Sequence, residues 1–177
     1  MNEARSPDPV DEPKAYQEHL LGLLGRDDPA EVQAGTPAAW RALVEEADDR
    51  LRERPEPDEW SVLECLGHAA DAEIVYSGRY RWIVAHDEPP LIGYDQALWV
   101  RRLHHRDDDP DRLLALLATL REANLDFWNR STPQERERVG LHSERGPESL
   151  DLSFRLIAGH DRFHLAQGRR ALDAVKA

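Results

Sequence analysis

Apolar residues recur every three or four positions along most of this 177-residue chain, the spacing that places them on one face of an α-helix. Four long stretches show the pattern, and each opens with a capping residue or an early proline. They cover approximately residues 36–51, 61–86, 109–127 and 147–171. Shorter helices are predicted at about 13–24, 28–34 and 95–104. No run alternates apolar and polar residues as a half-buried strand does, so the pattern predicts an all-α four-helix bundle with extra short N-terminal helices.

Three segments fall outside this helical pattern. Residues 1–12 contain four acidic residues and little to bury, which predicts a flexible N-terminal tail ahead of a single domain over residues 13–177. Residues 91–108 connect the second and third long helices, and their length indicates a crossover or a lid. Residues 140–146 are predicted to form a polar loop.

The charge balance argues against several classes of partner. Asp and Glu number 35 against 23 Lys and Arg, a net charge of −12, which opposes binding to nucleic acid and to an anionic membrane surface. No apolar run approaches the roughly 20 residues of a membrane span, and the N-terminus lacks the apolar core of a signal peptide. The single cysteine, Cys65, excludes an internal disulfide. These features predict a cytoplasmic protein.

Two histidines stand one helical turn apart near the C-terminus. His160 and His164 continue the inward-facing spacing of the last long helix, so both rings are predicted to lie inside the bundle. A buried imidazole needs a hydrogen-bond partner or a metal ion, and neutral imidazoles suit a divalent cation. The residues alone leave two interpretations open: a metal site, or a pair satisfied by neighbours such as Asp161 or Gln167.

His68 is the best candidate for a third ligand, because one histidine from a facing helix would complete a three-nitrogen site with open positions. Just before it, Ser61 and Glu64 have the spacing of a capping box, which explains Glu64 without a catalytic role. Cys65 stands at the hydrophobic-staple position and is predicted to pack in the core. Asp71 is either a hydrogen-bond partner of the His68 ring or an exposed acid.

Other polar positions have simpler explanations. His104 and His105 lie in a charged stretch and are predicted to be solvated surface. Asn124 lies on an apolar helix face, where it either lines a pocket or is satisfied across the bundle. Asp161 points about 100° away from His160 around the helix and is expected to contact the neighbouring helix.

The residues around the histidines resemble a known family. The motifs are Trp-Ser-x-x-Glu-x-x-Gly-His at 60–68 and His-Asp-x-x-His-Leu-x-Gln at 160–167. Between them lie Tyr94-Asp95-Gln96 with Trp99, and His142 followed by Gly146-Pro147. In this order and spacing, over about residues 36–175, the chain resembles the DinB superfamily. Within it, the chain is most similar to the YfiT-like candidate metal-dependent hydrolases.

This resemblance implies a fold and a metal site. The fold is an up-down-down-up four-helix bundle that is often a homodimer. The site holds one divalent metal between one histidine of the second long helix and two of the fourth, which are His68, His160 and His164 here. Nitrogen ligands suit Zn, Ni or Fe, and the sequence does not choose among them.

Three possible functions follow, of which the resemblance implies the two enzymatic ones. The favoured one is a hydrolase that acts on a small-molecule substrate through metal-bound water. The first alternative is a metal-dependent S-transferase that uses a low-molecular-weight thiol. The second is a non-catalytic, stress-related protein that binds a metal or a small ligand. A helical protein without metal, dimerising through an apolar face, is the remaining possibility.

The long connection and the loop before the last helix supply the remaining candidate site residues, since loops often carry function. Tyr94, Trp99 and His142 are predicted to contact substrate, together with Asn124 if it lines a pocket. Asp95 is the candidate general base, and no other residue has a stronger claim to that role.

Overall fold

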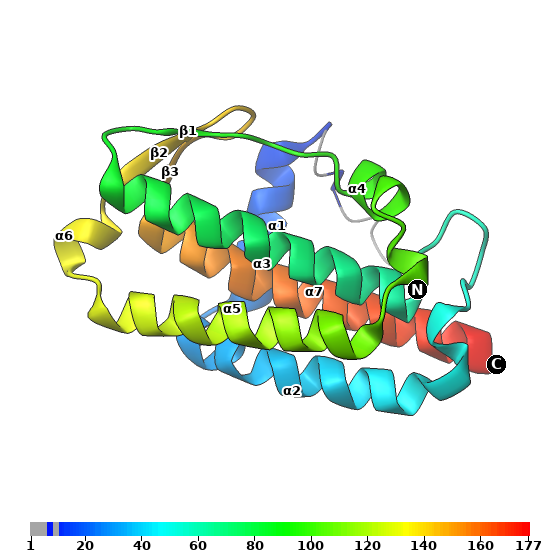
Figure 1. The fold of residues 1–177 in the computed structure, drawn as a ribbon. Coiled ribbons are helices and arrows are strands. Elements are labelled where there is room, and N and C mark those ends of the chain that lie inside the picture. The colour runs from blue at the N-terminus through cyan, green and yellow to red at the C-terminus, as the bar shows by residue number, and fades with distance from the viewer. Residues whose placement is uncertain (1–6, 9–10) are drawn as a thin grey trace.

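The computed structural model describes residues 7–8 and 11–177, so most of the predicted tail over residues 1–12 lies outside the described residues. Four long helices lie side by side in this part of the chain (Figure 1). Two of them, α2 and α7, run in one direction, and α3 and α5 run in the other. This is the predicted up-down-down-up bundle. The long helices are α2 (Pro29–Ala47), α3 (Val62–Ala85), α5 (Pro110–Arg130) and α7 (Leu150–Lys176).

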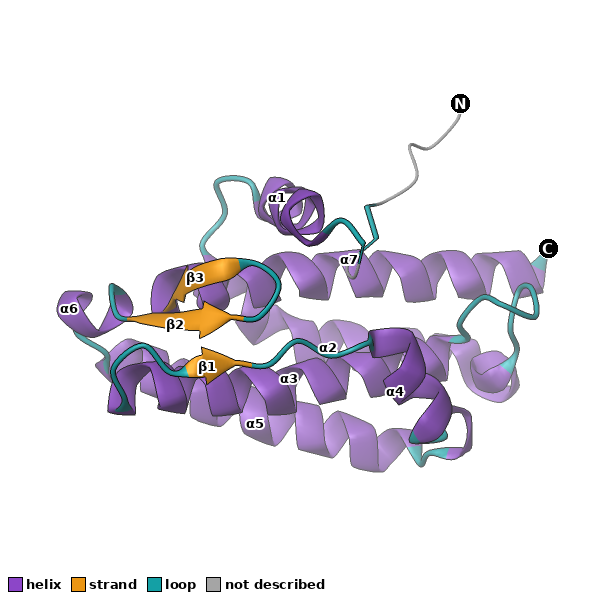
Figure 2. Ribbon diagram, turned by 90° about the horizontal axis from the view of Figure 1, so that it is seen from above, coloured by secondary structure: helices purple, strands orange, loops and turns teal. Residues whose placement is uncertain are grey.

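Shorter elements surround the bundle. Helix α1 packs against α7, and the connection from α3 to α5 returns along the bundle and carries β1 and α4 (Figures 1 and 2). The shorter helices are α1 (Pro13–Leu24), η1 (Asp48–Arg52), α4 (Gln96–Arg102), η2 (His105–Asp107) and α6 (Pro133–Arg136). None of the helices in the described residues is both long enough and apolar enough to cross a membrane.

The helix starts follow the capping residues of the sequence. Asp28 caps α2 by accepting from the backbone N–H of Ala30 at 2.7 Å. Ser61 and Glu64 form the predicted capping box of α3, and Glu64 also pairs with Arg54. Such caps satisfy backbone donors that no helical carbonyl reaches.

The prediction of a break before Pro37 was wrong, because α2 continues from Pro29 to Ala47. A proline inside a helix has no N–H, which leaves the carbonyl oxygen four residues earlier without its helical donor. Here that oxygen belongs to Gln33, and the guanidinium of Arg121 on α5 donates to it at 3.3 Å. The tertiary contact therefore satisfies the group that would otherwise end the helix.

The described residues also contain a small sheet that the sequence did not predict (Figure 2). Strand β1 (Pro90–Leu91) pairs in parallel with β2 (Val139–His142), and β2 pairs antiparallel with β3 (Gly146–Ser149). The predicted loop 140–146 is thus mostly strand and turn, and Pro147 lies in β3. Helix α7 begins at Leu150, capped by Ser149, rather than at residue 147.

A polar belt crosses the core between two apolar clusters. One cluster contains Leu66 and Leu172, and the other contains Ile83 and Ile157. On α7 the polar residues 160, 161 and 164 lie between the two clusters, opposite polar positions of α3 and α5. Cys65 packs in the first cluster, as predicted.

Candidate metal centre

Three histidine rings meet in the polar belt, where α3 packs against α7. His68 comes from α3, and His160 and His164 come from successive turns of α7. One nitrogen from each ring lies within 4.8 Å of the others. The closest pair joins Nε2 of His68 to Nε2 of His160 at 2.9 Å. The inward spacing of the last helix thus brings both of its histidines to the same point as His68.

Burial keeps these rings neutral. Their residues are between 0% and 6% exposed. Burial, together with the positive charge that neighbouring histidines would carry, lowers the pKa of His68 and of His160 well below its usual value. Burial also lowers the pKa of His164 to about 3, although its hydrogen bond with Gln167 acts in the opposite direction. All three rings therefore offer lone pairs at neutral pH.

Neighbouring side chains hold the rings in place. Nδ1 of His164 donates to the Gln167 amide oxygen at 2.8 Å, which turns its Nε2 lone pair inward. The Trp60 ring packs against the rings of His68 and His164, with centroids 5.2 and 6.0 Å apart. Gln167 thus orients one ring without using the nitrogen that faces the cluster.

The arrangement fits a divalent metal. Nε2 of His164 is buried and has no hydrogen-bond partner in the described residues, and such an orphaned atom is costly unless something binds it. Zinc binds imidazole nitrogen at about 2.0–2.1 Å, so two nitrogens on one tetrahedral ion lie roughly 3.3 Å apart. The ligand nitrogens of the three histidines lie within 4.8 Å of one another, so small side-chain shifts would bring them to that separation. His68 and His160 would hold the ion through Nε2, and their Nδ1 atoms have no partner.

Two hollows flank the cluster. A narrow cavity of about 50 Å³ has His160 in its wall, together with Tyr94, His142 and Arg79. A wider groove of about 580 Å³ has His164 in its wall, together with Trp60. Gln96 lines both hollows, so the start of α4 separates them.

The three candidates from the connection before α5 occupy different places. Tyr94 lines the narrow cavity, with its ring 6.4 Å from that of His68. The ring of Trp99 packs against the ring of Tyr94, with centroids 4.5 Å apart. Asp95 is exposed, and its carboxylate caps α4 by accepting from the backbone N–H of Leu98 at 2.9 Å. Asp95 therefore has a structural role and lines neither hollow.

The other two residues that were predicted to contact substrate also lie in different places. His142 ends β2 and lines the narrow cavity. Burial and the charges of Arg145 and Arg79 lower its pKa to about 4. Asn124 lies outside both hollows, and its amide donates to Glu73 and Ser77 at 2.7 Å each. Asn124 is thus satisfied across the bundle, which was the second of its two predicted roles.

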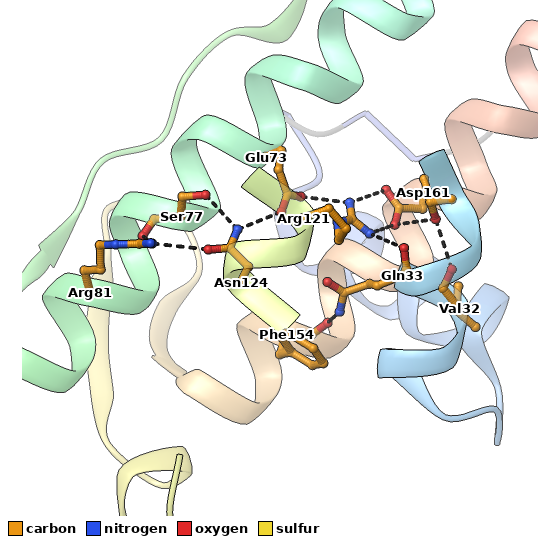
Figure 3. Close-up of polar contacts among 10 residues, drawn as sticks. Val32, Gln33, Glu73, Ser77, Arg81, Arg121, Asn124, Phe154 and Asp161 are labelled. Atoms are coloured by element: carbon orange, nitrogen blue, oxygen red, sulfur yellow. Dashed lines mark hydrogen bonds and ion pairs between the residues drawn. The ribbon is translucent and has the colours of Figure 1, made fainter. Parts of the chain in front are cut away.

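The polar network around Asn124 continues to the residue beside His160 (Figure 3). Arg121 stands at its centre, between Glu73 of α3 and Asp161 of α7. Asp161 also accepts from the Thr36 hydroxyl at 2.9 Å. Asp161 contacts neighbouring helices, as the sequence predicted. Its carboxylate binds Arg121 and Thr36 rather than the histidine rings.

His105 is buried, so its prediction as solvated surface was wrong. Its Nε2 lies 2.7 Å from Asp71 and its Nδ1 lies 2.6 Å from Asp108. The ring lies against Gly67, where an added Cβ would come within 2.5 Å of it. Asp71 is thus a hydrogen-bond partner of His105 and not of His68. A sequence pattern does not show this contact, because η2 returns to α3 from far along the chain.

Several polar residues of the narrow cavity were missed by the sequence reasoning, among them Arg79, Tyr16 and Arg145. Arg79 belongs to α3, Tyr16 to α1, and Arg145 to the turn before β3. A signal existed for Arg79, which stands three residues after Tyr76 and four before Ile83 on the buried face of α3. A charged residue at a core position of an amphipathic helix needs an explanation.

Comparisons with known proteins agree with this fold. A curated protein of Oceanobacillus iheyensis, named as a candidate metal-dependent hydrolase, is 24% identical over 107 residues, which are 60% of this chain and 62% of the relative. The match thus spans about three fifths of that relative's length. The solved structure of YfiT from Bacillus subtilis, described as a probable metal-dependent hydrolase with an unusual four-helix bundle topology, aligns with a TM-score of 0.76 at 20% identity. That alignment covers 99% of this chain and 93% of YfiT. A model of the DinB superfamily matches residues 31–167, and the chain belongs to that superfamily.

Proposed function

We propose that this protein is a metal-dependent hydrolase in which His68, His160 and His164 hold one divalent ion. The observation that carries the proposal is the buried Nε2 of His164, which points into a cluster of neutral imidazoles and has no partner. The name of the Oceanobacillus iheyensis relative supports the reaction class. Imidazole ligands suit Zn, Ni or Fe.

The metal, when bound, would supply a water of lowered pKa, about 7 for zinc, as a nucleophile. The chain contributes the surroundings. Three protein ligands would leave at least one position open, and the narrow cavity, whose wall contains His160, would be the route by which a substrate reaches it. The Trp60 ring covers the cluster on the side of the wider groove. Glu144 is the acid among the described residues that line the narrow cavity. Asp95 does not line this cavity.

The experiment compares hydrolysis of a panel of small esters and amides by metal-loaded wild type and His160→Ala. We expect activity in the wild type and loss of both bound metal and activity in the variant, which keeps its helical circular dichroism. His86→Ala is the matched control, because His86 is exposed at the end of α3. Asp95→Asn should keep its activity, since Asp95 caps a helix. Equal hydrolysis by wild type and His160→Ala would refute the proposal.

The same panel separates the alternatives that the family resemblance left open. Turnover that requires an added low-molecular-weight thiol would assign the protein to the metal-dependent thiol transferases. Metal binding without turnover in either assay would indicate a binding protein. The size of the second hollow, about 580 Å³ beside His164, makes the thiol arm of the panel worth including, because that groove has room for a second substrate.

A further inference from the structure

A buried arginine without a carboxylate partner stands in the wall of the narrow cavity. Arg79 is 2% exposed. Its Nη2 donates to the backbone oxygen of Ile92 at 2.8 Å and contacts Nε2 of His142 at 3.1 Å. Its Nε is buried without a partner, and no ion pair among the described residues joins Arg79 to an acid. A buried guanidinium without a counter-ion is unfavourable, so this one is prepared for an anion from outside the chain.

The other arginine of the cavity already has its partner. Nε and Nη2 of Arg145 donate to the same carboxylate oxygen of Glu148, at 3.0 and 2.7 Å. The second oxygen of Glu148 accepts from Ser153 at 2.7 Å. Burial would raise the pKa of Glu148, but Arg145, Ser153 and the more distant charge of Arg79 hold it below its usual value, so Glu148 is ionised and pairs directly with Arg145. Arg79 therefore carries the positive charge of the cavity wall that has no carboxylate in direct contact.

The remaining groups of the cavity include two tyrosine hydroxyls and one acid. Tyr16 lines the cavity, and its hydroxyl is buried without a hydrogen-bond partner in the described residues. Burial is the main cause that raises the pKa of Tyr16 and of Tyr94, so both hydroxyls keep their protons. The acid in the lining is Glu144, an exposed side chain whose carboxylate lies against Gly93, where an added Cβ would approach it within 2.4 Å.

The size of the cavity limits the anion. A volume of about 50 Å³ corresponds to roughly three to five water-sized groups, at about 10–15 Å³ each. This is room for a carboxylate and one more carbon, so the remaining atoms of a larger acid have to extend beyond this cavity. Because His160 belongs to the same wall, a ligand bound to Arg79 by its carboxylate extends toward the three histidines.

We propose that Arg79 and Tyr16 form a subsite for the carboxylate of a small organic acid, which places the rest of that substrate beside the histidine cluster. The guanidinium supplies charge-assisted hydrogen bonds through its free Nε–H, and the Tyr16 hydroxyl supplies a neutral one. The assignment of the acid as substrate rests on the proposed function, whereas binding of the carboxylate requires no metal.

The test uses metal-free protein and succinate as the probe, followed by calorimetry and thermal denaturation at constant ionic strength. We expect succinate to bind and to raise Tm more than matched sodium chloride or neutral succinamide. Arg79→Gln should weaken succinate binding about tenfold or more, since it removes a charge-assisted contact. Arg101→Gln, which removes the same charge from an exposed position of α4, should bind as wild type does.

Two milder variants keep the proposal testable if Arg79→Gln does not fold. Tyr16→Phe removes only a hydroxyl that has no partner, so we expect unchanged or higher Tm in buffer and weaker succinate binding. Glu144→Gln removes the acid of the cavity wall and should strengthen succinate binding. No protection by succinate beyond the salt control, or wild-type succinate affinity in both Arg79→Gln and Tyr16→Phe, would overturn the subsite.

Further outcomes separate this proposal from the proposed function. Tighter binding of inorganic phosphate than of succinate would overturn the choice of a carboxylate. Succinate binding that depends on Arg79, in a protein that takes up no metal, would leave the subsite standing and refute the hydrolase. Metal uptake without succinate binding would refute the subsite and leave the proposed metal site standing.

Discussion

Removal of the Asp161 carboxylate is predicted to destabilise the bundle. This carboxylate accepts hydrogen bonds from both terminal nitrogens of Arg121 and from the hydroxyl of Thr36. Arg121 is 1% exposed, so the Asp161→Ala variant leaves a buried guanidinium with Glu73 as its remaining acidic partner. Removing one partner of a buried ion pair costs about 3–5 kcal/mol.

The response of Glu73 moves the expected loss toward the lower end of this range. Burial is the main cause that raises the pKa of Glu73, and the negative charge of Asp161 raises it further. Without Asp161, Glu73 ionises more readily and becomes a better counter-ion for Arg121. We therefore expect Asp161→Ala to lower the free energy of unfolding by about 3 kcal/mol, which corresponds to a fall in Tm of about 6–12 °C for a chain of this size.

Urea denaturation followed by far-UV circular dichroism and tryptophan fluorescence measures this loss. Asp173→Ala is the matched control, because Asp173 is an exposed acid of the same helix, and it should change stability by less than about 0.5 kcal/mol. The double variant Asp161→Ala/Arg121→Met should lose less than the sum of the single losses, since no guanidinium is left short of partners and the buried Glu73, whose pKa burial raises, can stay protonated. A loss below about 1 kcal/mol for Asp161→Ala, or strict additivity in the double variant, would refute the reasoning.

Two further predictions concern pH and packing. Burial opposes protonation of His105, but its hydrogen bonds to Asp71 and Asp108 outweigh this and raise its pKa. The stability gained from the protonated ring is therefore fully present below the unfolded pKa of about 6.5 and is lost as pH rises through the higher folded pKa. The difference in unfolding free energy between wild type and His105→Gln should be larger at about pH 6 than at about pH 9, and an equal difference at both would contradict the assignment. A Cβ at Gly159 would lie 2.1 Å from the backbone oxygen of Leu20, so Gly159→Ala should cost about 1–3 kcal/mol in urea denaturation. Gly35→Ala, where nothing lies within 4 Å of the added Cβ, should instead stabilise by about 0.5–1 kcal/mol, and a similar effect of both substitutions would count against the close packing of α1 on α7.

Local signals in the sequence predicted the bundle and the meeting of its histidines. Caps such as Asp28 and Ser61 marked helix starts to within a residue. The unbroken spacing of α7 placed His160 and His164 on its buried face. Helix periodicity does not show which helices are neighbours, so the residues alone made His68 a candidate, and the family resemblance identified it as the third ligand.

The features that sequence reasoning missed depend on contacts between distant segments. The strands are two to four residues long, too short for an alternating pattern to show. Pro37 predicted a helix start because nothing local shows that Arg121 satisfies the carbonyl of Gln33. His105 is buried because η2 folds back on α3 beside Gly67. In these cases a tertiary contact outweighs the local propensity.

Binding of one divalent metal ion by the three histidines is the central claim, and equilibrium dialysis with zinc as the probe ion, followed by elemental analysis, tests it most directly. The measurement compares wild type with His68→Ala, His160→Ala and His164→Ala, and uses His86→Ala as control. We predict about one zinc per chain in the wild type and the control, and a large loss of zinc in each of the three variants, because two imidazoles form an incomplete site. Stoichiometric zinc in any of the three variants, or none in the wild type, would contradict the account.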